Sequence, residues 1–176
     1  MSWRRLRSTV PLLLVWSLAT PIDDAAATVD HKEIFGWAEK VLIGESQVAL
    51  TAKLDTGADT SSVHTAKIRR FRSDTGQVWV EFRVSESGGD RTIRFRKRLV
   101  RYAYIKEHEG PSQKRPVVNM EICLGTHRTV VEVSLVDRGS FDFPVLLGRN
   151  ALTGRVVVDP ELDFTAPPSC PAVERP

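Results

Sequence analysis

Apolar and polar residues alternate along much of the chain, which is the pattern of half-buried β-strands. Within 78–84 the valines and Phe82 fall on one parity and charged residues on the other, and 93–99 alternates with arginines in the same way. A turn rich in Gly and Ser at 85–90 separates the two segments. They are therefore predicted to pair as a β-hairpin whose arginine face is solvent-exposed.

Other short apolar segments bounded by turn residues are also predicted as strands. They lie at 35–43, 48–54, 102–105, 117–123, 129–136, 145–147 and 156–158. One helical turn is expected to begin at 150–152. No repeats or heptads occur, and short strands with frequent turns predict an all-β fold, a small closed single-lobe barrel with at most one short helix.

The strand at 48–54 leads into a group of chemically active residues, Asp55-Thr56-Gly57. Gly57 lets a substrate or a second chain come close to the backbone, and the Thr56 hydroxyl can bond to nearby backbone or to a facing copy of itself. Asp55 is a candidate catalytic acid. One carboxylate cannot be general acid and general base in the same step, so a second acid is needed, and another copy of the chain is its simplest source.

The same tripeptide occurs again at Asp74-Thr75-Gly76. Here arginines precede it and the strand-like Gln77-Val78 follows. An Asp and a Gly that bracket a polar residue between extended segments are typical of a turn. This second copy is therefore predicted to be structural.

Far downstream, residues 143–150 read Phe-Pro-Val-Leu-Leu-Gly-Arg-Asn. This apolar strand with Gly-Arg-Asn, together with Leu-Asp-Thr-Gly-Ala-Asp at 54–59, resembles the retropepsin-like aspartic proteases, single-lobed relatives of pepsin that work as homodimers. The resemblance covers about residues 34–164 and implies an acid protease barrel. It also implies that Arg149 pairs with Asp59. The site residues that it implies are Asp55 as the catalytic acid, supported by Thr56, Gly57, Ala58, Asp59 and Arg149.

The chain also resembles a bacterial branch of this family that is labelled ATP-dependent zinc protease. The resemblance extends to Phe-Gly-Trp at 35–37, Leu-Gly-Arg-Asn-Ala-Leu at 147–152 and Val-Asp-Pro at 158–160. The sequence has no Gly-x-x-x-x-Gly-Lys-Ser/Thr loop and no His-Glu-x-x-His helix, so neither ATP nor zinc has a recognisable binding motif. We expect no metal and no cofactor.

The function that these motifs imply is aspartic endopeptidase activity on a peptide or protein substrate. Homodimerisation would bring two copies of Asp55 together, and the pair would activate a water that attacks the peptide bond. The alternative is a non-catalytic module on the same barrel that binds a peptide or a cell-envelope fragment. A metallohydrolase is the third candidate.

Length and charge restrict the possibilities further. A chain of 176 residues can form one domain with a proper core but is too short for two pepsin-like lobes. The formal net charge is +3, and Lys and Arg are spread over strand-like segments instead of being massed beside aromatic residues. No nucleic-acid partner is expected.

The N-terminus has the layout of an export signal. Arg4, Arg5 and Arg7 precede an apolar segment at 10–19, and small residues follow at 25–27. We expect 1–27 to be a signal peptide, or else an uncleaved membrane anchor, followed by the protease domain at 28–166 and a Pro-rich disordered tail at 167–176. The expected location is the periplasm or the exterior of a bacterium, with contact to the inner membrane only if the segment stays uncleaved.

Three further features leave alternatives open. Cys123 and Cys170 either form a disulfide or remain a buried thiol and a free one. His64 either tunes the acid or is a hydrogen-bonded packing residue, and the latter is favoured. The strands around the polar stretch 106–115 form either a flap over bound peptide or an ordinary surface hairpin.

Overall fold

The computed structural model describes residues 31–106, 112–139 and 141–171. The elements in these residues are β1 (Glu33–Ile43), β2 (Val48–Leu54), β3 (Ser61–His64), β4 (Ala66–Arg72), β5 (Val78–Ser85), β6 (Thr92–Arg98), β7 (Arg101–Ile105), β8 (Gln113–Leu124), β9 (His127–Val136), β10 (Val145–Leu147), α1 (Arg149–Leu152) and β11 (Val156–Asp163). The expected all-β fold with one short helix is confirmed for the described part of the chain.

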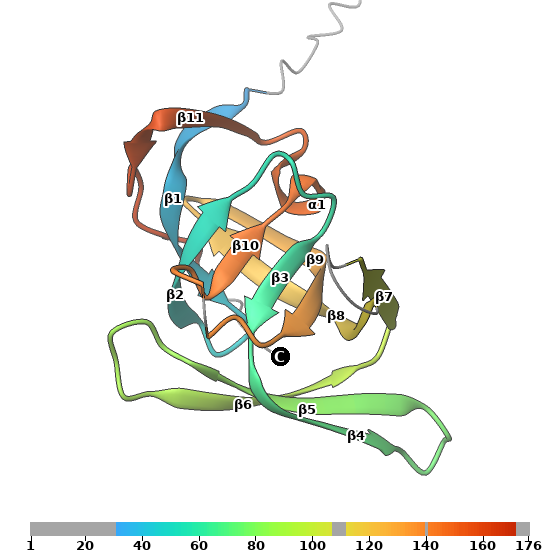
Figure 1. Cartoon of the computed structure of the whole chain (residues 1–176). Coiled ribbons are helices and arrows are strands. Elements are labelled where there is room, and N and C mark those ends of the chain that lie inside the picture. Colours follow the sequence, from blue (N-terminus) through green and yellow to red (C-terminus); the bar gives the residue numbers. More distant parts are fainter. Residues whose placement is uncertain (1–30, 107–111, 140, 172–176) are drawn as a thin grey trace, which may run out of the picture.

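The body of the molecule is a sheet that closes on itself (Figure 1). Its strand order is β11-β1-β2-β10-β3-β9-β8-β7, and β1 makes a second pairing with β8. That second pairing joins Val41, Leu42 and Ile43 to the end of β8. The ring removes most of the sheet's free edges, and the predicted closed barrel is confirmed.

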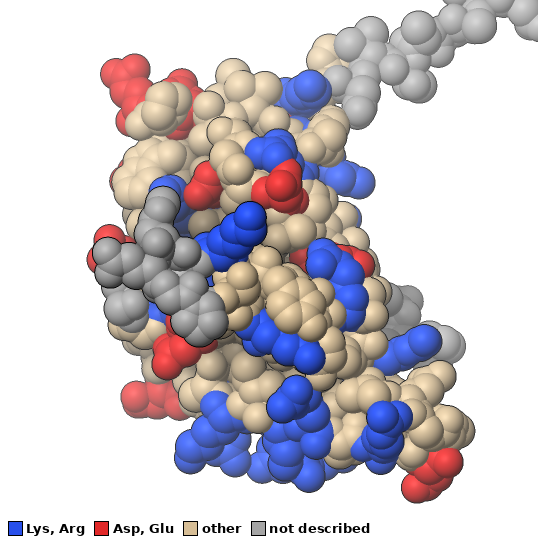
Figure 2. Space-filling view, turned by 45° about the vertical axis from the view of Figure 1, so that its right-hand side comes forward, with Lys and Arg blue, Asp and Glu red and all other residues tan. Residues whose placement is uncertain are grey.

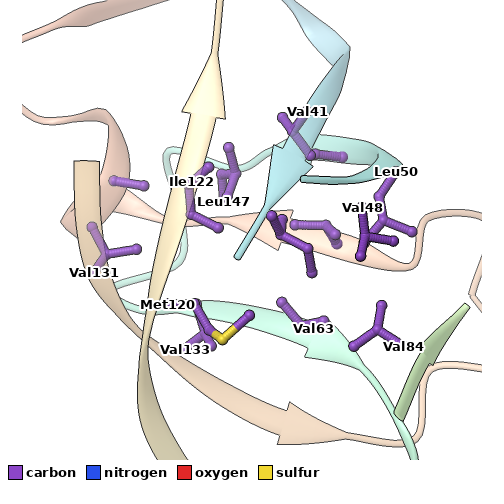
Figure 3. Close-up of a cluster of buried hydrophobic side chains, with 14 of the residues drawn as sticks. Val41, Val48, Leu50, Val63, Val84, Met120, Ile122, Val131, Val133 and Leu147 are labelled. Carbon is purple, nitrogen blue, oxygen red and sulfur yellow. The ribbon is translucent and has the colours of Figure 1, made fainter. Parts of the chain in front are cut away.

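The core lies inside this ring, where side chains from several strands meet (Figure 3). β2 contributes Val48, Leu50 and Leu54, each at most 3% exposed. Successive residues of a strand point to opposite faces, so burial of this set fixes the register of β2. Lys53 and Asp55 consequently lie on the parity that points away from the core.

A second sheet, β4-β5-β6, lies below the barrel in Figure 1. β5 and β6 pair as the predicted hairpin, with Phe82 opposite Phe95, and Arg94, Arg96 and Arg98 are exposed as expected. β4 and β6 each carry four Lys or Arg residues. Figure 2 shows basic side chains gathered along the lower part of the molecule, at the level of this sheet. The predicted turn at 74–76 connects β4 to β5 and is confirmed.

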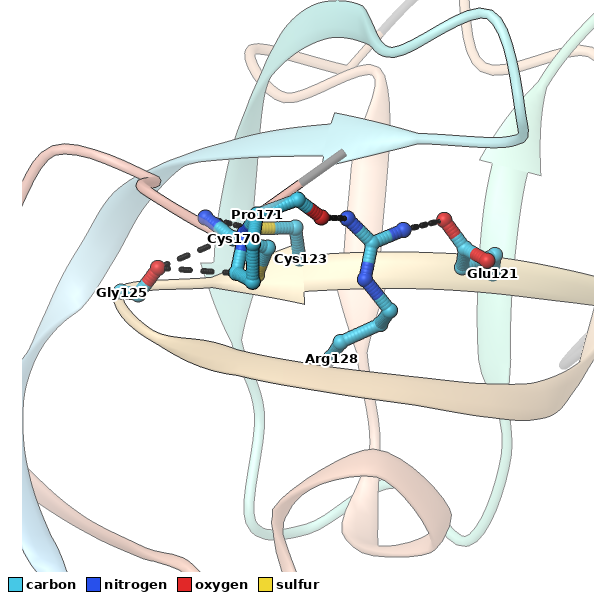
Figure 4. The surroundings of a disulfide bond; sticks show 6 residues. All are labelled: Glu121, Cys123, Gly125, Arg128, Cys170 and Pro171. Carbon is cyan, nitrogen blue, oxygen red and sulfur yellow. Dashed lines mark hydrogen bonds and ion pairs between the residues drawn. A yellow bond between two sulfur atoms is a disulfide. The ribbon is translucent and has the colours of Figure 1, made fainter. Parts of the chain in front are cut away.

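A disulfide joins Cys123 of β8 to Cys170, across 47 positions of sequence (Figure 4). The first of the two alternatives for the cysteines is therefore correct. Arg128 reinforces this attachment, because it contacts both Glu121 and the Pro171 carbonyl.

The segment after β11 is also held by a buried carboxylate. Glu39 is fully buried, and its Oε1 accepts hydrogen bonds from the Gly36 N–H at 2.8 Å and from the Thr165 N–H and hydroxyl at 3.0 and 2.6 Å. Within the expected disordered tail at 167–176, the described residues up to Pro171 are thus fastened to the barrel by the disulfide. Residues 172–176 lie outside the described part.

Two other expectations also fall wholly or partly outside the described residues. The signal peptide or anchor at 1–27 is one, and 107–111 of the polar stretch, expected to belong to a flap or to an ordinary surface hairpin, is the other. The strands on either side, β7 and β8, do pair antiparallel. In the described residues, no helix has the length and apolarity required to cross a bilayer.

Candidate active site

Asp55 is placed by the pairing of two strands from distant parts of the sequence. β10 runs parallel to β2, with Leu147 opposite Leu54, and the Asp55 N–H donates to the Leu147 carbonyl at 2.8 Å. The apolar strand before Gly-Arg-Asn therefore lies directly beside the strand that ends at Asp55. The two motifs that the sequence separates by almost a hundred residues form one site.

The Asp55 carboxylate lies at the start of an exposed loop. Its Oδ1 accepts the Gly57 N–H at 3.0 Å, which closes a tight turn. The Asp55 side chain is 28% exposed, and the Lys53 ammonium lies 3.9 Å from Oδ2. Thr56 and Gly57 are exposed. The acid is thus accessible to a substrate or to a second chain.

The Gly148 segment braces this loop from behind. The Gly148 N–H donates to the Ser61 hydroxyl at 3.1 Å, and that hydroxyl donates to the Asn150 side chain at 2.8 Å. A Cβ on Gly148 would lie 2.8 Å from the backbone of Ala58 and of Thr60. Only glycine fits here, because the two backbone segments approach so closely.

Arg149 connects to the same loop through its backbone and its side chain. Its N–H donates to the Ala58 carbonyl at 2.8 Å, and Nη1 donates to the Thr56 carbonyl at 2.9 Å. Its guanidinium also forms an ion pair with Asp59. All six residues named from the sequence are therefore brought together in one loop and its support. Ser61 and Asn150, to which the sequence assigned no role in the site, also take part in the support.

Asp55 also lines a cleft of about 350 Å³. The other lining residues are Trp37, Lys53, Arg138, Phe141, Asp142, Phe143 and Leu146. A larger cavity of about 650 Å³ lies between the end of β6 and the outer side of β8 and β9, lined by residues such as Trp79 and Asn119. Neither Asp55 nor its loop lines that cavity, so the smaller, mostly aromatic and charged cleft is the candidate site.

Arg138 is a residue of this cleft that the sequence did not reveal. It follows β9, in the segment between the predicted strands at 129–136 and 145–147. It is 8% exposed, and its guanidinium donates to the Phe143 carbonyl and to the Ser62 hydroxyl, both at 3.0 Å. Burial lowers the pKa of Arg138, repulsion from Arg115 lowers it further, and attraction to Asp55 opposes both.

His64 supports Arg138 instead of contacting the acid. Its Nδ1 accepts the Arg138 backbone N–H at 2.8 Å and lies 3.5 Å from the Asp137 carboxylate. Among the described residues, His64 has no hydrogen bond to Asp55. The structure therefore places His64 in the hydrogen-bonded packing role. In the same part of the chain, no cluster of three or more His, Cys, Asp or Glu side chains is arranged to hold a metal ion.

Comparison with known families finds one model that covers most of the chain. It is described as RimB-like, retropepsin-like aspartic endopeptidase RimB, and it matches residues 34–169. A crystal structure of the Legionella pneumophila protein Lpg0085, described as a protein of unknown function (DUF785), is also similar. It shares 34% sequence identity and a TM-score of 0.66, over 77% of this chain and 98% of the other.

Curated relatives are similar over a comparable region. A protein of Shewanella pealeana named "Probable alpha-L-glutamate ligase" is 36% identical over 140 residues, or 77% of this chain. A protein of Parasynechococcus marenigrum with the same name is 33% identical over 115 residues, or 64% of this chain. The matched regions span only 30% and 24% of these relatives. The chain thus corresponds to one part of these longer proteins.

Proposed function

Because the chain belongs to the RimB-like family of retropepsin-like aspartic endopeptidases, we propose that it hydrolyses peptide bonds with a pair of Asp55 carboxylates, one from each subunit of a homodimer. The observation that carries this proposal is the position of Asp55, which lines a cleft and opens an exposed loop that is braced from behind. Such a loop can meet its own copy across a two-fold axis.

Two facing carboxylates hold one proton between them over a window of pH, since both cannot ionise cheaply at hydrogen-bonding distance. The ionised member takes a proton from a water molecule that attacks the peptide carbonyl. The protonated member donates to the carbonyl oxygen, and the leaving nitrogen is protonated when the bond breaks. No step in this sequence requires a metal or a nucleotide.

The supporting residues have separate roles in this proposal. Gly57 leaves its backbone open to the substrate, and Thr56 bridges the two loops of the dimer. Asp59 and Arg149 brace each loop, in line with their ion pair. Ala58 contributes its carbonyl, which accepts the Arg149 N–H.

The decisive variant is Asp55→Asn. Asparagine keeps an oxygen that can accept the Gly57 N–H, so folding and dimerisation should remain nearly unchanged while peptide cleavage is lost. Asp74→Asn is the matched control, because Asp74 occupies the same tripeptide in an exposed turn and should leave cleavage intact. Cleavage by Asp55→Asn at the wild-type rate would refute the assignment.

Mixing subunits tests whether the second acid comes from another chain. If subunits exchange freely, an equal amount of Asp55→Asn added to wild type should reduce its activity to about half, because mixed dimers lack one carboxylate. Activity unaffected by mixing but abolished in Asp142→Asn would instead identify Asp142, which lines the same cleft, as the second acid. A purified domain that stays monomeric and cleaves no peptide would favour a binding module.

We also propose a substrate class and a location. The relatives that contain a similar region are named as alpha-L-glutamate ligases, which makes glutamate-containing peptides the first substrates to test. The disulfide between Cys123 and Cys170 supports an oxidising compartment, such as the bacterial periplasm or the exterior. Cleavage of a peptide library by the oxidised protein, measured from acidic to neutral pH, tests both the substrate class and whether the disulfide-bonded form is active.

A further inference from the structure

Arg138 is the one cation among the described residues that is buried, at 8% exposure. It lies at the start of the segment between β9 and β10 and lines the cleft that contains Asp55. A buried charge is expensive unless another charge or a set of hydrogen bonds compensates for it. The partners of this guanidinium therefore indicate what the site is built to hold.

Among the described residues, the Arg138 guanidinium forms hydrogen bonds only with neutral groups. Nε donates to the Phe143 carbonyl and Nη1 to the Ser62 hydroxyl, and the Phe141 ring centroid lies 4.5 Å from Cζ. None of the ion pairs found in the described part of the chain involves Arg138. Nη2 has no hydrogen bond there either. The guanidinium is thus held in place on one side and has an unused donor.

Neighbouring residues also hold Arg138 in this position. Phe141 covers one face of the guanidinium, and His64 fixes the backbone by accepting the Arg138 N–H. Asp55 attracts Arg138 electrostatically, but among the described residues the two form no ion pair. A planar guanidinium with free N–H groups binds a carboxylate through two parallel hydrogen bonds, and such charge-assisted bonds are among the strongest in proteins.

We propose that Arg138 binds a carboxylate of the substrate in the Asp55 cleft and so selects peptides that carry a negative charge close to the bond to be cut. This inference rests on the proposed endopeptidase function and assigns its specificity to one residue. The carboxylate comes either from an acidic side chain or from the C-terminus of the peptide, and the experiment must separate these two sources.

The test uses the full chain in the Asp55→Asn background, so that binding is measured without cleavage. Peptides containing glutamate are compared with matched peptides containing glutamine, each with a free and with an amidated C-terminus. We expect the charged peptide to bind about 10- to 100-fold more tightly, which is the ratio for one charge-assisted hydrogen-bonded pair. Tighter binding of the glutamate peptide than of the glutamine peptide would identify an acidic side chain as the source of the carboxylate. Tighter binding of the peptide with a free C-terminus than of the amidated one would identify the C-terminus.

Variants at position 138 then assign the preference. Arg138→Gln should bring the ratio between charged and neutral peptides close to one, whereas Arg138→Lys should keep part of it. Arg94→Gln is the matched control, because Arg94 is an exposed arginine of β6, outside the cleft, and should leave the ratio unchanged. An unchanged ratio in Arg138→Gln would overturn the proposal.

A second measurement keeps the test valid if Arg138→Gln does not fold. In the Asp55→Asn protein, the side-chain Nε–H resonance of Arg138 should shift when the charged peptide is added and stay in place with the neutral one. A resonance that responds only to protein concentration would show that a second subunit supplies the anion, and would overturn the assignment to substrate. Peptide binding to Asp55→Asn without cleavage by wild type would refute the endopeptidase function while leaving the role of Arg138 intact.

Discussion

Removal of the disulfide should cost the protein a large share of its stability, and the structure allows the effect to be sized. The bond between Cys123 and Cys170 closes a loop of 47 positions. The chain-entropy relation for a loop of this length gives about 4 kcal/mol at 25 °C, because the cross-link restricts the unfolded chain. We therefore expect the Cys123→Ala/Cys170→Ala variant to unfold with a free energy lower by about 2–5 kcal/mol, the range for native disulfides of small secreted domains.

Urea unfolding followed by tryptophan fluorescence and circular dichroism measures this difference. Oxidised wild type is compared with the double variant, each with and without a reducing agent. Reduction should move the wild-type midpoint to that of the variant and leave the variant unchanged. The slope of the transition is compared as well, because an altered slope reports a change in the unfolded state.

A decrease of less than about 1 kcal/mol would refute this reasoning. It would mean that the other contacts of the last described segment hold it without the bond. These include the hydrogen bonds from Thr165 to the buried Glu39 carboxylate and the contact of Arg128 with the Pro171 carbonyl. Equal stability of the oxidised and reduced wild type would lead to the same conclusion.

Two further predictions concern the support of the site and the second sheet. Gly148→Ala should destabilise the protein by about 1–3 kcal/mol in urea unfolding and reduce cleavage, since its Cβ would overlap the backbone of Ala58 and Thr60; wild-type activity would show that the close approach is unimportant. Hydrogen bonding to Arg96 is the main cause that lowers the Glu81 pKa below its ordinary value of 4.5. The ionised carboxylate therefore stabilises the fold at pH values above 4.5, and this contribution is lost as the pH falls through the lowered pKa. The stability gap between wild type and Glu81→Gln should accordingly be constant near neutral pH and close in acid, and a gap that widens in acid would contradict this sign.

The sequence predicts the placement of Asp55 well because the information is local. Alternation in 48–54 determines which residues of β2 are buried, and that parity turns Lys53 and Asp55 away from the core. The hairpin of β5 and β6 follows from the same rule. The link to the Gly-Arg-Asn segment came from resemblance to a family, since no local pattern indicates that β10 pairs with β2.

Arg138 could not be found in this way, because its environment is made by the topology. In the sequence it is one more arginine among many, and others such as Arg94 and Arg98 of β6 are exposed. Its burial arises only because Ser62 of β3 and Phe143 before β10 meet beside it. The attachment of the C-terminal segment could not be predicted for the same reason. In the sequence Glu39 is an ordinary charged residue of a strand, and only the fold brings Thr165 beside it. Residues whose role depends on distant partners of different type leave no periodic signal.

The exposure of the loop bears on how a dimer would assemble. The ion pair between Asp59 and Arg149 has side chains 83% and 48% exposed, and a pair so open to water contributes about 0–1 kcal/mol. The loop is held mainly by the Ser61 hydroxyl bonds and by the backbone bonds that reach the Ala58 and Asp59 carbonyls. These contacts form within one chain, so the loop is ordered when the chain folds. The proposed dimerisation would then need little further ordering of the site, which is the condition under which a modest interface can bring two Asp55 carboxylates together.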